Sequence, residues 1–388
     1  MNQRKWPMKA FLLAIFMGIC LFTLTTSCAP VISRLLLLGN KHVELITEIN
    51  HPLLNIIPGY EPGMICLPGE VLETPALPDE LLANPPMDSG IGTGFGARDI
   101  PGAIALGNNT YQIPPDRSIE ASYHLIYPET QINSFPLPLR VFVLLDEQVV
   151  KNVFRNSSGD YYDISLDPGT VTTLTLNIPP LASGVHDLII FSITGVDQDT
   201  DPYGHFGFTD YRVSLVVGHN AKLIPRQYAT FPPLQSISPL DSIAGVSLIL
   251  SSNSERPEAW SWPETRREIP ADDPFVLYAY AGYDSFSEDN KTDPPQADTM
   301  ALIAFMDYHP TPIGDNSPVL YGKVSSDTAW ASIPVELNLP SEIGPHDVMI
   351  LRIPHPGVPM CLLRDPSKSD YWYPEAVIAS RVGINVIK

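Results

Sequence analysis

The chain has 388 residues and a formal net charge of −20, with 43 acidic against 23 basic side chains. This balance disfavours nucleic acid as a partner, because phosphate binding needs a basic face, and it disfavours peripheral attachment to anionic lipid. The 41 prolines remove backbone donors and break helices. We therefore expect short strands and proline-rich turns after the first thirty residues, as in an exported all-β protein.

Residues 1–27 have the pattern of an export signal, in which basic residues precede an uncharged, mostly apolar stretch and small residues follow it. Ser27–Cys28–Ala29 resembles the lipobox of bacterial lipoproteins. The resemblance implies a lipid on Cys28, and a membrane-anchored chain outside the cytoplasm, at the cell surface or on the periplasmic side. Two alternatives stay open. No charge interrupts Lys9 to Arg34, which is nearly long enough for an uncleaved anchor helix, and an ordinary signal cleavage is the other alternative.

The other cysteines indicate a possible cross-link. Cys20 lies inside the signal, so Cys66 and Cys361 are left once Cys28 carries the lipid. Two remaining cysteines in an exported protein favour one disulfide. The alternative is two buried or unpaired thiols.

Residues 28–117 are expected to form an anchor-proximal spacer that is partly ordered, because turn-forming Pro and Gly dominate and no periodicity persists. Within it, "GTGFGA" (residues 92–97) formally matches the dinucleotide-binding fingerprint. That fingerprint must follow a strand and open a helix, whereas turn residues stand on both sides here. We therefore interpret it as a flexible linker.

From residue 118 the sequence has short runs of β-branched and aromatic residues, separated by turn signals such as "NSSGD" and "DPGT". Examples are "LRVFVLLDEQVV", "VTTLTLNIP" and "TDYRVSLVVG". Several short strands at this spacing predict a β-sandwich. Its expected extent is 118–218, followed by a linker at 219–239.

A second copy of this pattern occupies 240–388. "GVHDLIIFSI" (184–193) matches "GPHDVMILRI" (344–353), so that His186–Asp187 corresponds to His346–Asp347. Upstream, "VFVLLD" ends at Asp146 and "IAFMD" at Asp307, which gives Asp-to-His spacings of 40 and 39 residues. Ordered matches at nearly equal spacing predict a tandem domain.

The stretch "PPLASGVHD" resembles the turn that leads into strand F of immunoglobulin-like and fibronectin-III-like bacterial modules. The resemblance implies an all-β fold of two tandem immunoglobulin-like β-sandwiches, with a binding or spacer role and no catalytic residues. We therefore expect His186 and His346 to be structural, with catalysis or metal binding as the alternative.

Common catalytic motifs are absent from the sequence: there is no phosphate-binding loop, no His-Glu-x-x-His and no Gly-x-Ser-x-Gly. Two other features are candidate sites. Asp197, Asp199 and Asp201 alternate in one loop, and clustered oxygen ligands suit Ca²⁺; a solvated acidic turn is the alternative. Four aromatic residues of the second copy are candidates for stacking on a ligand, with packing in the sandwich as the alternative: Trp260, Trp262, Tyr371 and Trp372.

The sequence therefore predicts a non-enzymatic cell-envelope lipoprotein that binds or scaffolds an extracytoplasmic protein or polysaccharide through loops on rigid sandwiches. It predicts no cofactor other than possible calcium. The alternatives are a glycan-active enzyme with convergent carboxylates and a structural subunit of an envelope assembly.

Overall fold

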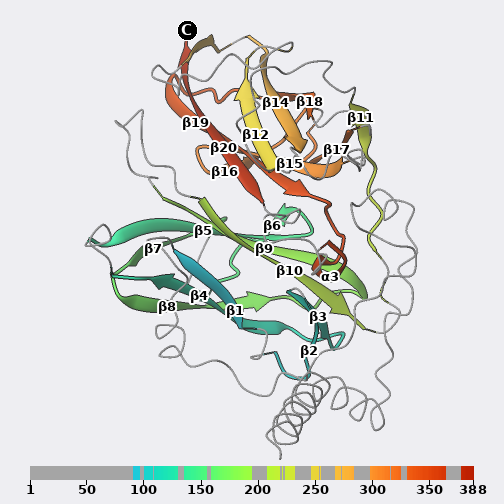
Figure 1. Cartoon of the computed structure of the whole chain (residues 1–388). Helices are drawn as coiled ribbons and strands as arrows, with labels where there is room; N and C mark the ends of the chain where they lie inside the picture. The colour runs from blue at the N-terminus through green and yellow to red at the C-terminus, as the bar shows by residue number, and fades with distance from the viewer. Residues whose placement is uncertain are drawn as a thin grey trace, which may run out of the picture. The chain divides into compact units, whose positions relative to one another are not determined.

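A computed structural model of the chain describes two β-sandwiches and segments that join them. The described residues are 91–96, 100–107, 109–129, 135–154, 159–194, 208–218, 221, 223–231, 246–252, 254, 267–271, 273–283, 298–314, 316–324, 330–363 and 377–388. In these residues the regular structure is β-strand, apart from the short helix α3 (Met360–Leu363). The all-β prediction is confirmed (Figure 1).

The first sandwich consists of a three-stranded and a seven-stranded sheet. The three-stranded sheet has the order β1-β4-β8, with bounds Gly92–Gly96, Ile119–Tyr127 and Thr170–Ile178. The seven-stranded sheet has the order β2-β3-β10-β9-β5-β6, and β7 also pairs with β5. Its strands are β2 (Ile104–Gly107), β3 (Thr110–Ile113), β5 (Leu137–Leu145), β6 (Gln148–Val149), β7 (Tyr162–Leu166), β9 (Gly184–Thr194) and β10 (Phe208–Val217).

The first sandwich extends further toward the N-terminus than the boundary at residue 118. Strand β1, which includes most of the "GTGFGA" stretch, pairs antiparallel with β4, and β3 pairs parallel with β10. The interpretation of "GTGFGA" as a flexible linker is therefore wrong. Strand β1 is a glycine-rich edge strand, and only Phe95 in it carries a large apolar side chain into the core, so the sequence lacks the alternation by which strands are recognised.

The second sandwich repeats the same plan. Its three-stranded sheet has the order β12-β14-β18, and its seven-stranded sheet has the order β11-β17-β15-β19-β20-β13, with β16 also paired to β15. The strands are β11 (Ala229–Phe231), β12 (Val246–Ser251), β13 (Arg267–Pro270), β14 (Phe275–Tyr283), β15 (Asp298–Met306), β16 (His309–Thr311), β17 (Leu320–Val324), β18 (Trp330–Leu337), β19 (Gly344–Pro354) and β20 (Ile378–Ile387). Strand β11 lies in the stretch predicted to be linker and pairs parallel with β17.

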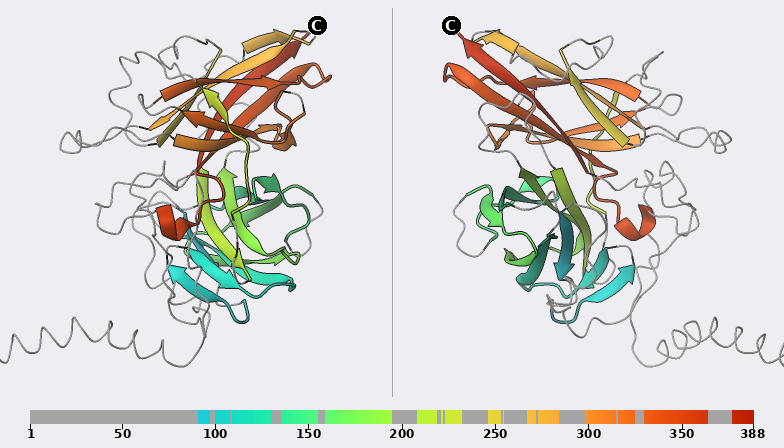
Figure 2. Two further views of the ribbon diagram at one scale, coloured as in Figure 1. Left: turned by 90° about the vertical axis from the view of Figure 1, so that its right-hand side faces the viewer. Right: turned by 60° about the vertical axis from the view of Figure 1, so that its left-hand side comes forward.

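The tandem relationship is visible strand by strand. In each copy a hairpin strand (β5, β15) pairs with a long strand (β9, β19), which pairs with the last strand (β10, β20). A short strand then pairs parallel with that last strand, β3 in the first copy and β13 in the second. Figure 2 shows the two layers of each sandwich from two further directions.

Each sandwich has its own apolar core between its two sheets, and a further core joins the two sandwiches. Ten consecutive residues of β9 are buried, because alternate residues of the strand point into two different cores. Leu188 and Ile190 belong to the core of the first sandwich, whereas Ile189, Phe191 and Ile193 belong to the joining core. A strand that is covered on both faces is expected to have an unbroken apolar run of this kind.

The joining core is built from the outer faces of the two seven-stranded sheets. Phe142 of β5 and Phe191 of β9 stack with ring centroids 4.8 Å apart. Phe305 of β15, from the other sandwich, meets both rings edge-on at 5.4 and 5.9 Å. Edge-on and stacked pairs add to the free energy of burying the rings, so equivalent faces of the two copies form one hydrophobic interface.

Candidate functional site: the junction between the sandwiches

The His–Asp pair at the start of β9 is part of a hydrogen-bonded clip. His186 Nδ1 lies 2.7 Å from Oδ2 of Asp146, and its Nε2 lies 2.8 Å from the carbonyl oxygen of Ala182. The other carboxylate oxygen of Asp146 accepts the backbone N–H of Asp187 at 3.0 Å. The clip therefore joins the β5–β6 turn, the segment before β9 and the first residues of β9.

The second sandwich contains the same clip. His346 Nδ1 lies 2.6 Å from Oδ2 of Asp307, its Nε2 lies 2.9 Å from the carbonyl oxygen of Glu342, and the N–H of Asp347 donates to Oδ1 of Asp307 at 2.9 Å. This arrangement supports the structural interpretation of both histidines. The nearly equal Asp-to-His spacing in the sequence reflects one hydrogen-bond pattern made twice.

Both imidazole rings face acceptors only. A neutral imidazole has one N–H, whereas the imidazolium has two, so only the protonated ring satisfies a carboxylate and a carbonyl together. Burial alone would lower the pKa of His186, but the hydrogen bonds to Asp146 and to the Ala182 carbonyl raise it above its ordinary value. The pKa of His346 is raised in the same way by Asp307 and the Glu342 carbonyl, against the effect of burial.

Each clip fixes a two-residue hairpin turn. Asp146 and Glu147 have φ values of 49° and 61°, and Asp307 and Tyr308 have φ values of 48° and 66°. Two positive φ values in a two-residue loop are typical of a type I′ turn, where Asp is common at the first position. Glu147 and Tyr308 are large residues in a backbone conformation that costs about 1–2 kcal/mol, and both side chains lie at the junction.

One buried ion pair lies at this junction. Arg212 of β10 donates from Nε and Nη2 to both carboxylate oxygens of Asp187, with the shortest contact at 2.6 Å, and both side chains are 1% exposed. The guanidinium also donates across the junction to the carbonyl oxygens of Pro354 at 2.6 Å and His355 at 3.0 Å. Arg212 therefore holds the end of β19 from the other sandwich.

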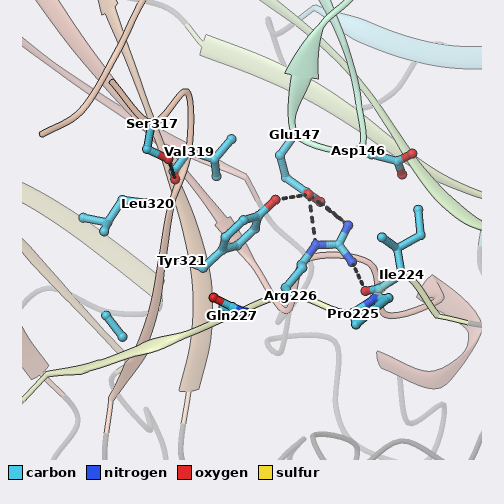
Figure 3. Close-up of a pocket in the computed structure, with 11 residues that line it drawn as sticks. Asp146, Glu147, Ile224, Pro225, Arg226, Gln227, Ser317, Val319, Leu320 and Tyr321 are labelled. Atoms are coloured by element: carbon cyan, nitrogen blue, oxygen red, sulfur yellow. Dashed lines mark hydrogen bonds and ion pairs between the residues drawn. The ribbon is translucent and has the colours of Figure 1, made fainter. Parts of the chain in front are cut away.

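A second buried ion pair lines a cavity of about 450 Å³ between the sandwiches. Arg226, from the segment between the sandwiches, donates to both oxygens of Glu147 at 2.8–3.0 Å, and the hydroxyl of Tyr321 on β17 donates to Glu147 at 2.9 Å (Figure 3). Burial raises the pKa of Glu147, and the charge of Arg226 acts in the opposite direction. Burial would lower the pKa of Arg226, but the charge of Glu147 raises it.

The connection after β19 packs on the first sandwich. Val358 and Met360 join an apolar cluster with Leu106 and Val216 of the first sandwich. The N–H of Met360 donates to Ser214 Oγ, and the N–H of Cys361 donates to Thr110 Oγ1, each at 2.9 Å. We call residues 355–363 the strap, because they reach from one sandwich onto the other.

The second sandwich has an ion pair that is equivalent to Asp187–Arg212, and it lies at a different place in the junction. Arg381 of β20 donates to Asp347, and the Tyr308 hydroxyl donates to the same carboxylate at 3.3 Å. The Tyr308 ring lies 5.1 Å from the guanidinium carbon of Arg140, a residue of the first sandwich. The equivalent turns in the two copies therefore both bridge the junction, one through Glu147 and the other through Tyr308.

These contacts determine what the cavity offers to a ligand. Its charged side chains are Asp146, Glu147 and Arg226, and each is engaged by protein groups in the clip or the ion pair. The described residues contain no cluster of three or more His, Cys, Asp or Glu side chains that could hold a metal ion. The arrangement is suited to holding the sandwiches together.

Within the described part of the chain, no helix is long and apolar enough to cross a membrane.

Most of the candidate site residues predicted from the sequence lie outside the described residues. They are Cys28, Cys66, Asp197, Asp199, Asp201, Trp260, Trp262, Tyr371 and Trp372. Lipid attachment, calcium binding and aromatic stacking therefore stay predictions. Cys361 is described and is disulfide-bonded; its partner is one of the three other cysteines, all outside the described residues, so the pairing with Cys66 also stays a prediction.

The sequence interpretation overlooked the residues that join the sandwiches. Arg212 and Arg381 occupy matching places in "YRVSLVV" and "SRVGINVI", and a charge repeated inside an apolar strand was the signal that could have revealed them. Glu147 and Tyr308 follow the two repeated aspartates. Arg226 has no counterpart in the repeat, so nothing in the sequence distinguished it.

No protein-family model and no curated protein matches the chain. Among solved structures, the CARDB domain from Pyrococcus furiosus in complex with di-metal ions is similar at 14% identity, over 35% of this chain and 96% of that domain, with a TM-score of 0.21. CBD12 from CALX1.2 is similar at 7% identity, over 63% of this chain and 76% of that chain, with a TM-score of 0.19. The strand order defines the chain as an all-β protein of two β-sandwiches.

Proposed function

We propose that this chain is a non-enzymatic, extracytoplasmic binding or scaffold module of the cell envelope, held at a membrane by a lipid on Cys28. The observation that carries the proposal is the junction, in which an apolar core and two buried ion pairs join the sandwiches. The charged side chains of the junction are already paired with one another, so they are better suited to joining the sandwiches than to acting on a substrate. A rigid body of two sandwiches presents its loops at fixed positions, and such loops commonly carry binding.

The anchor has a direct test. The full chain is produced in a bacterial host that is fed an alkyne fatty acid, and the label is detected on the protein. We expect labelling that is lost in Cys28→Ser and retained in Cys20→Ser, which serves as the matched control. Unlabelled wild-type protein that is released from membranes by high salt would overturn the lipid anchor.

The binding role is tested by capture from the envelope of the same cells, with calcium or with a chelator. We expect one protein or polysaccharide to be recovered reproducibly with the wild-type chain. If calcium organises the loop with Asp197, Asp199 and Asp201, converting the three to Asn will abolish capture. The control converts three acidic residues of another loop to Asn: Asp284, Asp289 and Asp293. Recovery of no common partner under either condition would contradict the binding role.

A further inference from the structure

The two His–Asp clips are directly connected to the junction. Asp146, which accepts from His186, precedes Glu147, the residue that pairs with Arg226 and Tyr321. Asp307, which accepts from His346, precedes Tyr308, whose hydroxyl donates to Asp347 at the junction. In each copy the aspartate that contacts the histidine ring is followed directly in the sequence by the residue whose side chain bridges the sandwiches.

A second connection runs through the start of the long strand. The carboxylate of Asp146 also accepts the N–H of Asp187, and the carboxylate of Asp187 pairs with Arg212, which donates to the other sandwich. The carboxylate of Asp307 likewise accepts the N–H of Asp347, whose carboxylate pairs with Arg381. Each clip therefore fixes two consecutive elements of the junction, the hairpin turn and the strand start.

We propose that the protonated rings of His186 and His346 lock the junction between the sandwiches, so that the junction opens more readily as the pH of the surroundings rises. Loss of a proton leaves one ring nitrogen without its N–H, facing either a carboxylate or a carbonyl oxygen. A partly buried acceptor–acceptor contact is unfavourable, so the turn and the strand start are held together less firmly. The proposal concerns the mechanics of the junction and is independent of the proposed lipid anchor and partner.

The charged groups around each ring agree with this direction. His186 faces the carboxylate of Asp146, while the more distant guanidinium of Arg226 opposes its protonation. His346 faces the carboxylate of Asp307, and the charge of Glu342 also favours protonation. The two histidine residues are 7% and 6% exposed. The pKa of each ring is higher in the folded chain than in the unfolded chain, where it is about 6.5. The stabilisation of the junction is therefore complete below about pH 6.5 and is lost as the pH rises through the pKa of the folded state.

The test measures ring titration and junction opening on the same full-length chain. Nuclear magnetic resonance follows both imidazole rings from pH 5 to 9, and hydrogen exchange gives protection factors, corrected for intrinsic exchange, for the amides of 146–149 and of the strap. We expect both rings to titrate above 6.5. We also expect protection to fall up to tenfold per pH unit for each ring, between about 6.5 and its folded pKa, and then to level off.

Variants separate the lock from other titrations. His186→Gln and His346→Gln are each expected to remove one ring's share of the pH dependence of protection, and the double variant is expected to remove both shares. His124→Gln is the control, because His124 contacts Thr173 on the three-stranded sheet of the first sandwich. The pH dependence should persist in this control.

Three results would overturn the proposal. The first is titration of both wild-type rings at or below 6.5, which needs no variant to fold. The second is wild-type protection that is the same at all pH values, and the third is an unchanged pH dependence in the double variant.

Discussion

Gly357 of the strap and Arg226 of the segment between the sandwiches are packed so closely that a side chain on Gly357 would overlap the Arg226 guanidinium. Gly357 also has a φ of 73°, a conformation that L-residues adopt only at a cost. The N–H of Gly357 lies 3.3 Å from Oδ2 of Asp187. One glycine thus lies beside both buried ion pairs of the junction.

The Gly357→Ala variant is expected to lose about 4 kcal/mol of unfolding free energy, because the methyl group strains the backbone and displaces Arg226 from Glu147. Denaturant unfolding monitored by fluorescence measures this loss. Gly314→Ala is the matched control, since Gly314 has a φ of 56° but no atom within 4 Å of the added methyl group. We expect the control to lose only about 1 kcal/mol; equal losses would show that Arg226 is not displaced.

The Glu147–Arg226 pair is expected to behave as a unit. Arg226→Met leaves a buried carboxylate with only the Tyr321 hydroxyl as a side-chain donor, which should cost about 3–5 kcal/mol. The double variant Glu147→Met/Arg226→Met removes both charges and should recover most of that loss. A double-mutant cycle from denaturant unfolding gives the coupling. Additive losses in the double variant would contradict this prediction.

Phe191 is expected to be a sensitive apolar residue of the junction, because its ring contacts one partner in its own sheet and one in the other sandwich. Phe191→Ala should lower the unfolding free energy by about 3–5 kcal/mol. It should also promote self-association of the exposed face, which light scattering measures. Phe135→Ala is the control, since Phe135 is 77% exposed, and its effect should stay within about 0.5 kcal/mol.

Removal of the Asp146 charge should change the titration of His186. Asn tolerates the left-handed backbone of the turn, so Asp146→Asn keeps the turn but replaces the carboxylate by a neutral acceptor. We expect the pKa of His186 to fall toward its ordinary value, as followed by nuclear magnetic resonance of the ring. Asp163→Asn removes a carboxylate that pairs with Arg140 instead, and it should leave the His186 titration unchanged.

The disulfide at Cys361 is expected to stabilise the docking of the strap. Reduction of the full chain with a dithiol should lower the unfolding free energy by about 2–4 kcal/mol, and Cys361→Ser should abolish the effect of the reductant. Peptide mapping of the non-reduced protein identifies the partner, which we predict to be Cys66. A Cys361 peptide linked to Cys20 or Cys28 would contradict that pairing. Either link would also count against the predicted lipid on Cys28.

The strands that begin the first sandwich show where sequence patterns stop being informative. Strands β2 and β3 have four residues each, and β1 has three glycines among five. Segments this short show neither a clear period of two nor an apolar run, so turn composition dominated the interpretation. Strand β1 pairs with β4, β3 pairs with β10, and β2 pairs with β3, and only those tertiary partners make them strands.

The clips show the opposite case. The order Asp, then His–Asp, recurs in both copies at nearly the same spacing, and this repetition by itself indicated a structural role for His186 and His346. It did not reveal that Asp146 and His186 are hydrogen-bonded, because a separation of 40 residues becomes a contact only when β5 and β9 pair in register.

The sequence by itself determined the all-β class, the tandem repeat and the strands with unbroken apolar runs, because these depend on local propensity and periodicity. Only the tertiary structure decided that the outer faces of the two seven-stranded sheets pack together, and that Arg226 inserts beside Glu147, 79 residues away in the chain. An apolar run shows that a strand is covered on both faces but not by what. The covering partner is selected by shape and charge complementarity between surfaces that exist only after each sandwich has folded.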